Sequence, residues 1–282
     1  MSSFPENRLL KMLADKQVPL GMQCFTGSPE LIEVMGHTGF DFVMLDAEHS
    51  GNNPRAMEAL IRTADAAGLV SLVRVPDRHN ETDIRRALEA GAHGLFIPMV
   101  RSAKDVEFAA RAAFFPPLGM RGICPSVRAA RYAFSSFEEF THWNNTQTLI
   151  IPMIEHPEAV DNIDEICARD DVRMVVFGAG DLCYAMGHGT LMMKSPEVQA
   201  AYRKVLDSAR RHGVAVIGGP VLDPTAAACR KSLDDGVTVF CLGLDTLGFR
   251  RFCEQTVNEL HRGVAGSAYT RPVPPASGFH AR

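Results

Sequence analysis

Two acidic residues each follow an apolar run, and together they could bind a metal ion. Glu155 comes directly after Ile151 to Ile154, and Asp181 follows Met174 to Phe177 across a short glycine-containing turn. If these runs are adjacent parallel strands, both carboxylates lie at one rim of the sheet. Two carboxylates completed by water suit a hard divalent cation such as Mg²⁺ or Mn²⁺. The alternative is that Asp181 caps the following helix and Glu155 is merely solvated.

A second group of reactive side chains, Asp46-Ala47-Glu48-His49, follows the apolar stretch 40–45. His49 is a candidate base, and Glu89 is a candidate for the acid that fixes its tautomer. The alternative is a loop histidine without a role. His156 is a weaker candidate of the same kind.

Arg74 lies within the apolar run 70–75, where an unpaired guanidinium would be costly to bury. It either pairs with Asp46 or Glu48, or points into a site and hydrogen-bonds a developing enolate oxygen. Both interpretations remain open from the residues alone.

The turn Gly178-Ala179-Gly180-Asp181 has a second potential use. Small residues before a helix let backbone N–H groups approach an anion such as a substrate carboxylate. Any tight strand-to-helix turn favours such residues, so this pattern does not decide the function. None of the six lysines lies at a predicted strand end, which disfavours a Schiff-base mechanism.

The elements that must position these residues alternate between short apolar runs and longer amphipathic stretches. Eight strand-helix units predict a single-domain α/β protein with a (β/α)8 TIM-barrel fold over residues 1–262. Nearly continuous apolar runs are typical of strands covered on both faces. The predicted strands are 18–25, 40–45, 70–75, 93–98, 148–154, 173–178, 214–218 and 238–243.

Capping patterns predict where several helices begin. A polar residue precedes proline at Ser28-Pro29, Asn53-Pro54, Ser195-Pro196 and Asp223-Pro224.

Two regions depart from the alternation of strands and helices. Residues 116–147 are long enough to suggest a functional loop, and residues 263–282 are expected to form a flexible tail.

Composition narrows the class of protein. The chain has 282 residues, a net charge of −4 and no basic stripe, which argues against nucleic acid as a partner. Neither an apolar run of membrane-spanning length nor a secretory signal is present, so we expect no membrane association. Seven widely spaced cysteines are typical of reduced thiols in a cytoplasmic protein.

Several motifs in order make the chain similar to the HpcH/HpaI aldolases over about residues 7–260. The motifs run from Gly39-Phe40-Asp41-Phe42 and Asp46-Ala47-Glu48-His49 to Gly178-x-x-Asp181-Leu182. Between them lie Val73-Arg74-Val75-Pro76, Leu88-Glu89-Ala90-Gly91-Ala92, Ile97-Pro98-Met99-Val100, the segment Phe115 to Gly122, and Ile154-Glu155.

The resemblance implies a role for each matching residue. Glu155 and Asp181 would hold a divalent metal, Mg²⁺ or Mn²⁺ first and Co²⁺ or Zn²⁺ next. Arg74 would contact the keto oxygen of the substrate, and His49 would be the acid/base, with Asp46 in the surrounding network. The substrate carboxylate would lie at Ala179 and Gly180. It also implies a homo-oligomer, commonly a hexamer, whose C-terminal helix is exchanged between subunits.

The chain departs from the family pattern at three places. Glu89 replaces the usual aspartate partner of the histidine, Met153 replaces a glutamine near the substrate, and Gly178-Ala179-Gly180-Asp181 replaces Gly-Pro-Ala-Asp. The core of the aldolase interpretation survives, but identity with any one known enzyme of the family does not follow.

We expect a metal-dependent aldolase that reversibly cleaves a 4-hydroxy-2-oxo acid into pyruvate and an aldehyde. One alternative is a citrate-lyase-like enzyme acting on coenzyme A esters; the sequence shows no clear phosphate-binding cluster of basic residues, although Arg121, Arg128 and Arg131 in the long loop could serve as one. Another is a barrel that binds a 2-oxo acid without catalysis.

Overall fold

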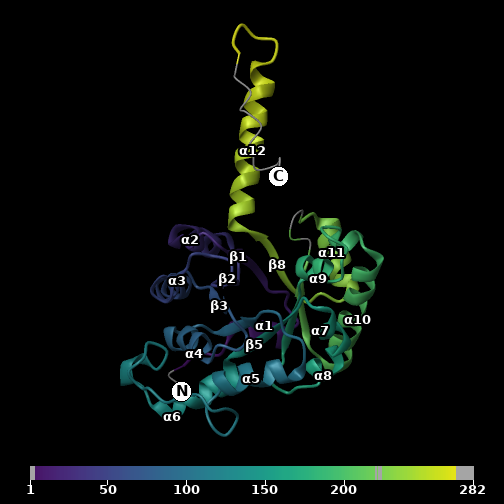
Figure 1. Ribbon diagram of the computed structural model, residues 1–282. Helices are drawn as coiled ribbons and strands as arrows, with labels where there is room; N and C mark the ends of the chain where they lie inside the picture. The colour runs from purple at the N-terminus through teal and green to yellow at the C-terminus, as the bar shows by residue number, and fades with distance from the viewer. Residues whose placement is uncertain (1–3, 220, 222–223, 271–282) are drawn as a thin grey trace.

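Eight parallel strands form a closed barrel in chain order, from β1 to β8 (Figure 1). The computed structural model describes residues 4–219, 221 and 224–270. The prediction of a (β/α)8 barrel is confirmed, and each observed strand overlaps its predicted run. The strands are β1 (Leu20–Cys24), β2 (Phe42–Asp46), β3 (Val70–Arg74), β4 (Gly94–Ile97), β5 (Leu149–Ile154), β6 (Met174–Phe177), β7 (Ala215–Gly218) and β8 (Val239–Leu244).

Helices surround the barrel and return the chain from the end of one strand to the start of the next (Figure 1). They are α1 (Arg8–Ala14), α2 (Pro29–Thr38), α3 (Pro54–Ala66), α4 (Glu81–Ala90), α5 (Ala103–Ala113), η1 (Arg131–Ala133), α6 (Phe137–Gln147), α7 (Pro157–Asp161), α8 (Ile163–Cys167), α9 (Ala179–Ala185), η2 (Met192–Lys194), α10 (Pro196–His212), α11 (Ala226–Asp235) and α12 (Asp245–Val264).

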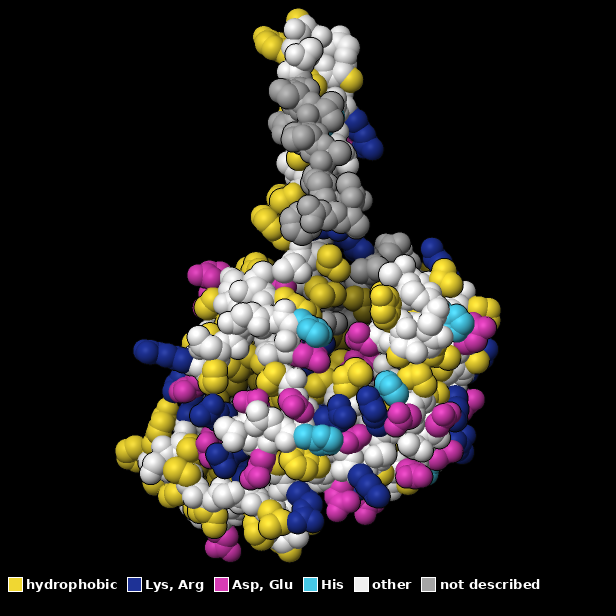
Figure 2. Space-filling view, in the orientation of Figure 1, with side chains coloured by type: hydrophobic (Ala, Val, Ile, Leu, Met, Phe, Trp, Pro, Cys, Tyr) yellow, Lys and Arg dark blue, Asp and Glu magenta, His cyan; other side chains and the backbone are white. Residues whose placement is uncertain are grey.

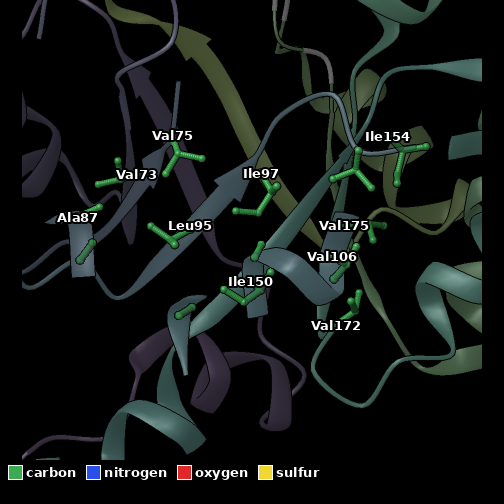
Figure 3. Packing of buried hydrophobic residues seen from close by; sticks show 14 of the residues in the cluster. Val73, Val75, Ala87, Leu95, Ile97, Val106, Ile150, Ile154, Val172 and Val175 are labelled. Atoms are coloured by element: carbon green, nitrogen blue, oxygen red, sulfur yellow. The ribbon is translucent and has the colours of Figure 1, made fainter. Parts of the chain in front are cut away.

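Apolar side chains on the two sides of the barrel strands form two separate cores. One core, including Val73, Leu95 and Val175, packs between the strands and the helices (Figure 3). The other, including Phe42, Met44 and Leu72, fills the inside of the barrel. Because side chains alternate along a strand, every second residue belongs to the same face. This alternation decides which residues reach the site.

The predicted helix starts are largely confirmed. Ser28, Asn53 and Ser195 each cap a helix by accepting a hydrogen bond from a backbone N–H in its first turn. The prediction at Asp223-Pro224 was wrong, because α11 begins two residues later and Thr225 is its cap. Asp223 itself lies outside the described residues.

The segment 116–147 is irregular in its first part and helical in its last part. It contains α6, and Phe115 and Phe140 form a small core with Phe4. Arg121 is buried among them, stacks on the Phe115 ring at 4.8 Å and donates to Asn144 at 2.8 Å. The segment therefore builds a packed extension of the barrel.

Helix α12 stands away from the barrel at the carboxyl end of β8 (Figure 1). It extends two residues into the predicted tail, and residues 271–282 of that tail lie outside the described residues. Asp245 is its one buried residue, whereas Phe249 and Phe252 are exposed. No helix in the described part of the chain is long and apolar enough to cross a membrane.

Candidate active site

The candidate site lies inside the barrel at the carboxyl ends of the strands. On β2, β3 and β5 the inward residues Met44, Leu72 and Met153 belong to the interior core. The next inward positions along these strands are Asp46, Arg74 and Glu155. All three are buried polar residues. The surface is hollowed at the base of α12, with acidic and histidine side chains at its edge (Figure 2).

Arg74 is held by two acids from the neighbouring strand and the loop that follows it. Its Nε donates to Oδ1 of Asp46 at 2.6 Å, and its Nη1 lies 3.0 Å from Oε2 of Glu48. Asp46 also accepts hydrogen bonds from the backbone N–H groups of Glu48 and His49. Arg74 is therefore paired, as one of the two interpretations predicted, and Asp46 organises the loop as well as the arginine.

The third nitrogen of the Arg74 guanidinium has no partner. Its Nη2 atom is buried and makes no hydrogen bond. The ring of Phe25 lies 5.4 Å from Cζ of the same guanidinium. An unpaired buried donor is costly, so it marks a place where an acceptor such as a substrate oxygen would be stabilised. The structure therefore also supports the second interpretation of Arg74.

The carboxyl group of Glu155 is buried and accepts a hydrogen bond from the backbone. Oε1 accepts from the backbone N–H of Met99 at 2.6 Å. The pKa of Glu155 is raised to about 7, mainly by burial and in smaller part by the charges of Asp181 and Glu48, while the Met99 N–H and Arg74 oppose the shift. A cation beside this carboxyl group would stabilise its charged form.

Gly178 leaves room for the Glu155 carboxylate. A Cβ atom at this position would lie 2.6 Å from Cβ and 2.8 Å from Oε2 of Glu155, closer than real contacts allow. Gly178 also precedes α9, whose first turn carries the exposed Asp181. The glycine therefore lets the Glu155 side chain lie directly against the backbone that leads into α9.

The donor set fits a divalent cation that is only partly enclosed by protein. Glu155 follows β5 and Asp181 follows the neighbouring strand β6, so both carboxylates lie at the carboxyl end of the barrel. Among the described residues no group of three or more His, Cys, Asp or Glu side chains is arranged to bind a metal. A cation held here would therefore take its remaining ligands from water and substrate, as Mg²⁺ often does.

The predicted substrate-binding residues lie around the same space. Ala179 and Gly180 form the start of α9, and the first helical hydrogen bond runs from Leu182 N–H to the Gly178 carbonyl. The N–H groups of residues 179–181 are therefore not used within the helix. Met153 lies inside the barrel and is buried, one inward position below Glu155.

His49 is exposed and its nearest acid is Glu48, whose Oε2 lies 3.7 Å from Nε2 of the histidine. Burial raises the pKa of Glu48, while Arg74 and His49 oppose this shift. His156 instead caps α7 by accepting from Glu158 N–H at 3.3 Å.

The predicted pairing of His49 with Glu89 does not occur within the chain. Glu89 lies in the last turn of α4, just before β4 begins, so it is near the amino ends of the strands. His49 follows the carboxyl end of β2. The ion-pair partner of Glu89 is Arg85, at 4.0 Å. Within one chain, the predicted pairing was therefore wrong. Helix α4 runs from the carboxyl ends of the strands back to their amino ends, so its last turn, with Glu89, lies at the end of the barrel opposite His49.

Sequence reasoning missed two contributors to the site, Phe25 and the Met99 N–H, and it did not foresee that Gly178 makes room for Glu155. Counting inward positions in steps of two could have found Phe25, which follows Gln23 on β1, and Gly178, which follows Val176 on β6. The hydrogen bond from Met99 had no signal in the sequence, because it depends on a left-handed backbone conformation with φ of 51°.

Comparison with known protein families agrees with this geometry. The family model described as HpcH/HpaI aldolase/citrate lyase matches residues 21–251. A 5-keto-4-deoxy-D-glucarate aldolase from Klebsiella pneumoniae is 32% identical over 248 residues, covering 88% of this chain and 93% of the relative.

Solved structures resemble the barrel closely. An HpcH/HpaI aldolase/citrate lyase family protein from Burkholderia cenocepacia is 30% identical, with a TM-score of 0.81 over 90% of this chain and 99% of that protein. The citrate synthase SbnG is 26% identical, with a TM-score of 0.81 over 90% of this chain and 98% of that protein.

Proposed function

The chain belongs to the HpcH/HpaI aldolase/citrate lyase family and is a carbon–carbon lyase of the aldolase type, and from this premise we propose its specific reaction. The enzyme reversibly cleaves a 4-hydroxy-2-oxo acid into pyruvate and an aldehyde, and it depends on a divalent metal ion. The reaction needs a group that stabilises negative charge on the keto oxygen and a base for the hydroxyl group.

One observation carries the proposal: the free Nη2 donor of Arg74. Its guanidinium is fixed by Asp46 and Glu48 but keeps this one buried nitrogen unpaired. A donor that is fixed before the substrate arrives stabilises charge without reorganisation, and such a donor typically contributes about 10²–10³ in rate. The arrangement fits an enolate oxygen formed during the reaction.

Glu155 and Asp181 are the residues that would hold the metal ion, with Mg²⁺ or Mn²⁺ as first candidates and Co²⁺ or Zn²⁺ next. A bound divalent cation would supply Lewis acidity that favours negative charge on the keto oxygen. The high pKa of metal-free Glu155 supports this assignment, because burial beside other acids is costly without a cation.

The residues of the chain then divide the reaction between them. The N–H groups at Ala179 and Gly180 bind the substrate carboxylate, and Arg74 donates to the keto oxygen. His49 accepts the proton of the C4 hydroxyl, directly or through water. The C3–C4 bond breaks to release the aldehyde, its electron pair forms the enolate, and a proton added at C3 completes pyruvate.

The identity of the aldehyde is the finer part of the proposal. Because a relative is named for 5-keto-4-deoxy-D-glucarate, this compound is the first substrate to test. Met153, buried beside the site, offers an apolar contact in place of an amide. We further infer a homo-oligomer, a hexamer by family resemblance, and a cytoplasmic location that suits seven free cysteines.

The structure offers no support for the alternative use of coenzyme A esters. Arg121 is buried and bonded to Asn144, and Arg128 donates to Asp65 and the Ala90 carbonyl. Arg131 lies over the Phe4 ring, 4.8 Å from its centroid. All three arginines are therefore engaged in contacts within the fold.

The deciding experiment measures pyruvate release from 5-keto-4-deoxy-D-glucarate, followed by a screen of aldehydes with pyruvate in the synthetic direction. We expect activity that EDTA abolishes and that Mg²⁺ or Mn²⁺ restores. The Glu155→Ala/Asp181→Ala double variant should be inactive at every metal concentration. EDTA-insensitive turnover, or turnover by this double variant, would contradict the metal assignment. Pyruvate binding without turnover of any substrate would favour a binding protein.

A further inference from the structure

Asp245, the first residue of α12, makes more hydrogen bonds to the turn after β1 than to its own helix. Its carboxylate accepts from the backbone N–H groups of Phe25 at 3.1 Å and Thr26 at 3.0 Å. It also accepts from the Thr26 hydroxyl at 2.5 Å and, within α12, from Thr246 N–H at 2.7 Å. Asp245 is only 6% exposed. These contacts fix the turn after β1.

Phe25, whose backbone N–H donates to the Asp245 carboxylate, also packs against the guanidinium of Arg74. Phe25 directly follows the last residue of β1 and packs against the interior core. The centroid of its ring lies 5.4 Å from Cζ of Arg74, within the range of an attractive cation–π interaction. The two acids hold Nε and Nη1 of Arg74, and the ring limits movement of the guanidinium plane.

We propose that Asp245 is a positioning residue that holds Phe25 against Arg74 and so sets the affinity of the site for the 2-oxo acid. The inference rests on the proposed function, since it assumes that Arg74 binds the keto oxygen. It also connects α12 to the chemistry, because Asp245 joins this helix to the barrel and at the same time fixes the backbone of Phe25 beside the site.

A capping role alone would not need these contacts. The N-cap position of α12 is Leu244, which makes no side-chain cap hydrogen bond, and only one Asp245 contact is to its own helix. The other hydrogen bonds cross to a segment about 220 residues earlier in the chain. Asparagine at this position would retain one acceptor oxygen and place an NH₂ group against N–H donors.

The test compares Asp245→Asn and Phe25→Leu with the wild-type protein, using pyruvate with Mn²⁺ as the probe in calorimetric titrations and steady-state assays. We expect each variant to raise the Kd and KM for the 2-oxo acid by about ten-fold, with kcat changed much less. In an Arg74→Lys background, Asp245→Asn should add no further loss of affinity, because both changes act through one contact.

Asp41→Asn is the matched control. Asp41 is also buried, and it also accepts a backbone hydrogen bond, from Leu20 N–H at 2.9 Å, but at the opposite end of the barrel. It should lower thermal stability without changing the Kd for pyruvate.

The outcomes separate the two proposals. A wild-type protein that binds no pyruvate in the presence of Mn²⁺ contradicts the proposed function itself. A wild-type protein that binds pyruvate, with Phe25→Leu and Asp245→Asn binding it equally well, overturns only the positioning role. If Asp245→Asn does not fold, the affinity of Phe25→Leu decides. Equal losses of affinity in Asp41→Asn and Asp245→Asn would also overturn the proposal, since they would indicate general destabilisation.

Discussion

Asp46 and Arg74 face each other across neighbouring strands, in direct register between β2 and β3, with an Nε-to-Oδ1 distance of 2.6 Å. Each is the last residue of its strand and points into the barrel. Removing one partner of such a buried pair leaves the other charge uncompensated, at a cost of about 3–5 kcal/mol. The pair therefore fixes Arg74 without using all of its donors.

Replacing Arg74 with lysine tests this geometry while keeping the charge. One ammonium group cannot reproduce the separate contacts to Asp46 and Glu48 and still point a donor at the substrate. We expect kcat/KM for retro-aldol cleavage to fall by about 10²–10³. Pyruvate release measured by a coupled assay gives the result. Arg62→Lys, at an exposed pair on α3, should remain fully active. Wild-type kinetics in Arg74→Lys would exclude the proposed contact with the keto oxygen.

Replacing Glu155 with glutamine tests the electrostatic cost of the metal-free site. The folded pKa of about 7 lies above the ordinary value of 4.5, so the folded chain holds a proton that the unfolded chain releases between these values. Metal-free stability should therefore fall as pH rises through this window and level off above pH 7. At pH 8 in EDTA, the free energy of unfolding of Glu155→Gln should exceed that of the wild type by a few kcal/mol, since each pKa unit corresponds to about 1.4 kcal/mol.

Urea unfolding at pH 8 and at pH 4.5 measures this difference. The gain should be absent at pH 4.5, where wild-type Glu155 is protonated in the fold. Mn²⁺ should stabilise the wild type at pH 8 but not Glu155→Gln, and the exposed Glu158→Gln should behave like the wild type. Equal stability of Glu155→Gln and the wild type in EDTA at pH 8 would show that Glu155 carries no such cost.

The barrel and the strand-end residues could be predicted because both follow from local patterns. Continuous apolar runs indicate buried parallel strands, and the polar residue ending each run lies at the rim. Asp46 and Glu155 were identified in this way, and Arg74 as a charged residue within an apolar run; all three are buried in the structure. Their common inward direction follows from the alternation of side chains along a strand.

The partners of these residues depend on distances that local patterns do not encode. Glu89 and His49 lie at opposite ends of the barrel, although both belong to motifs of the family. Asp46 and Glu48 were offered as alternative partners of Arg74, and the structure pairs Arg74 with both. Asp245 and Phe25 are joined across almost the whole chain. Such contacts are fixed by closure of the barrel between β1 and β8.

Replacing His49 with alanine should lower kcat for cleavage by about 10²–10⁴, the usual contribution of a positioned acid or base. Binding of pyruvate should change little, because His49 acts on the C4 hydroxyl, which pyruvate lacks. Single-turnover cleavage and pyruvate titration together measure the two effects. His37→Ala, at an exposed position of α2, is the control. Unchanged cleavage by His49→Ala would assign the proton transfer to another group.

The exposed face of α12 predicts that the helix packs on another copy of the chain. Phe249 and Phe252 are 66% and 63% exposed, and their rings stack at 6.5 Å on a helix with one buried residue in the described structure. Two exposed aromatic side chains on a projecting helix are typical of an interface. The Phe249→Ser/Phe252→Ser variant should therefore dissociate to smaller species in light scattering, while Arg251→Ser retains the wild-type mass. A wild type with the mass of a single chain would contradict this prediction, as would an unchanged mass in the double variant.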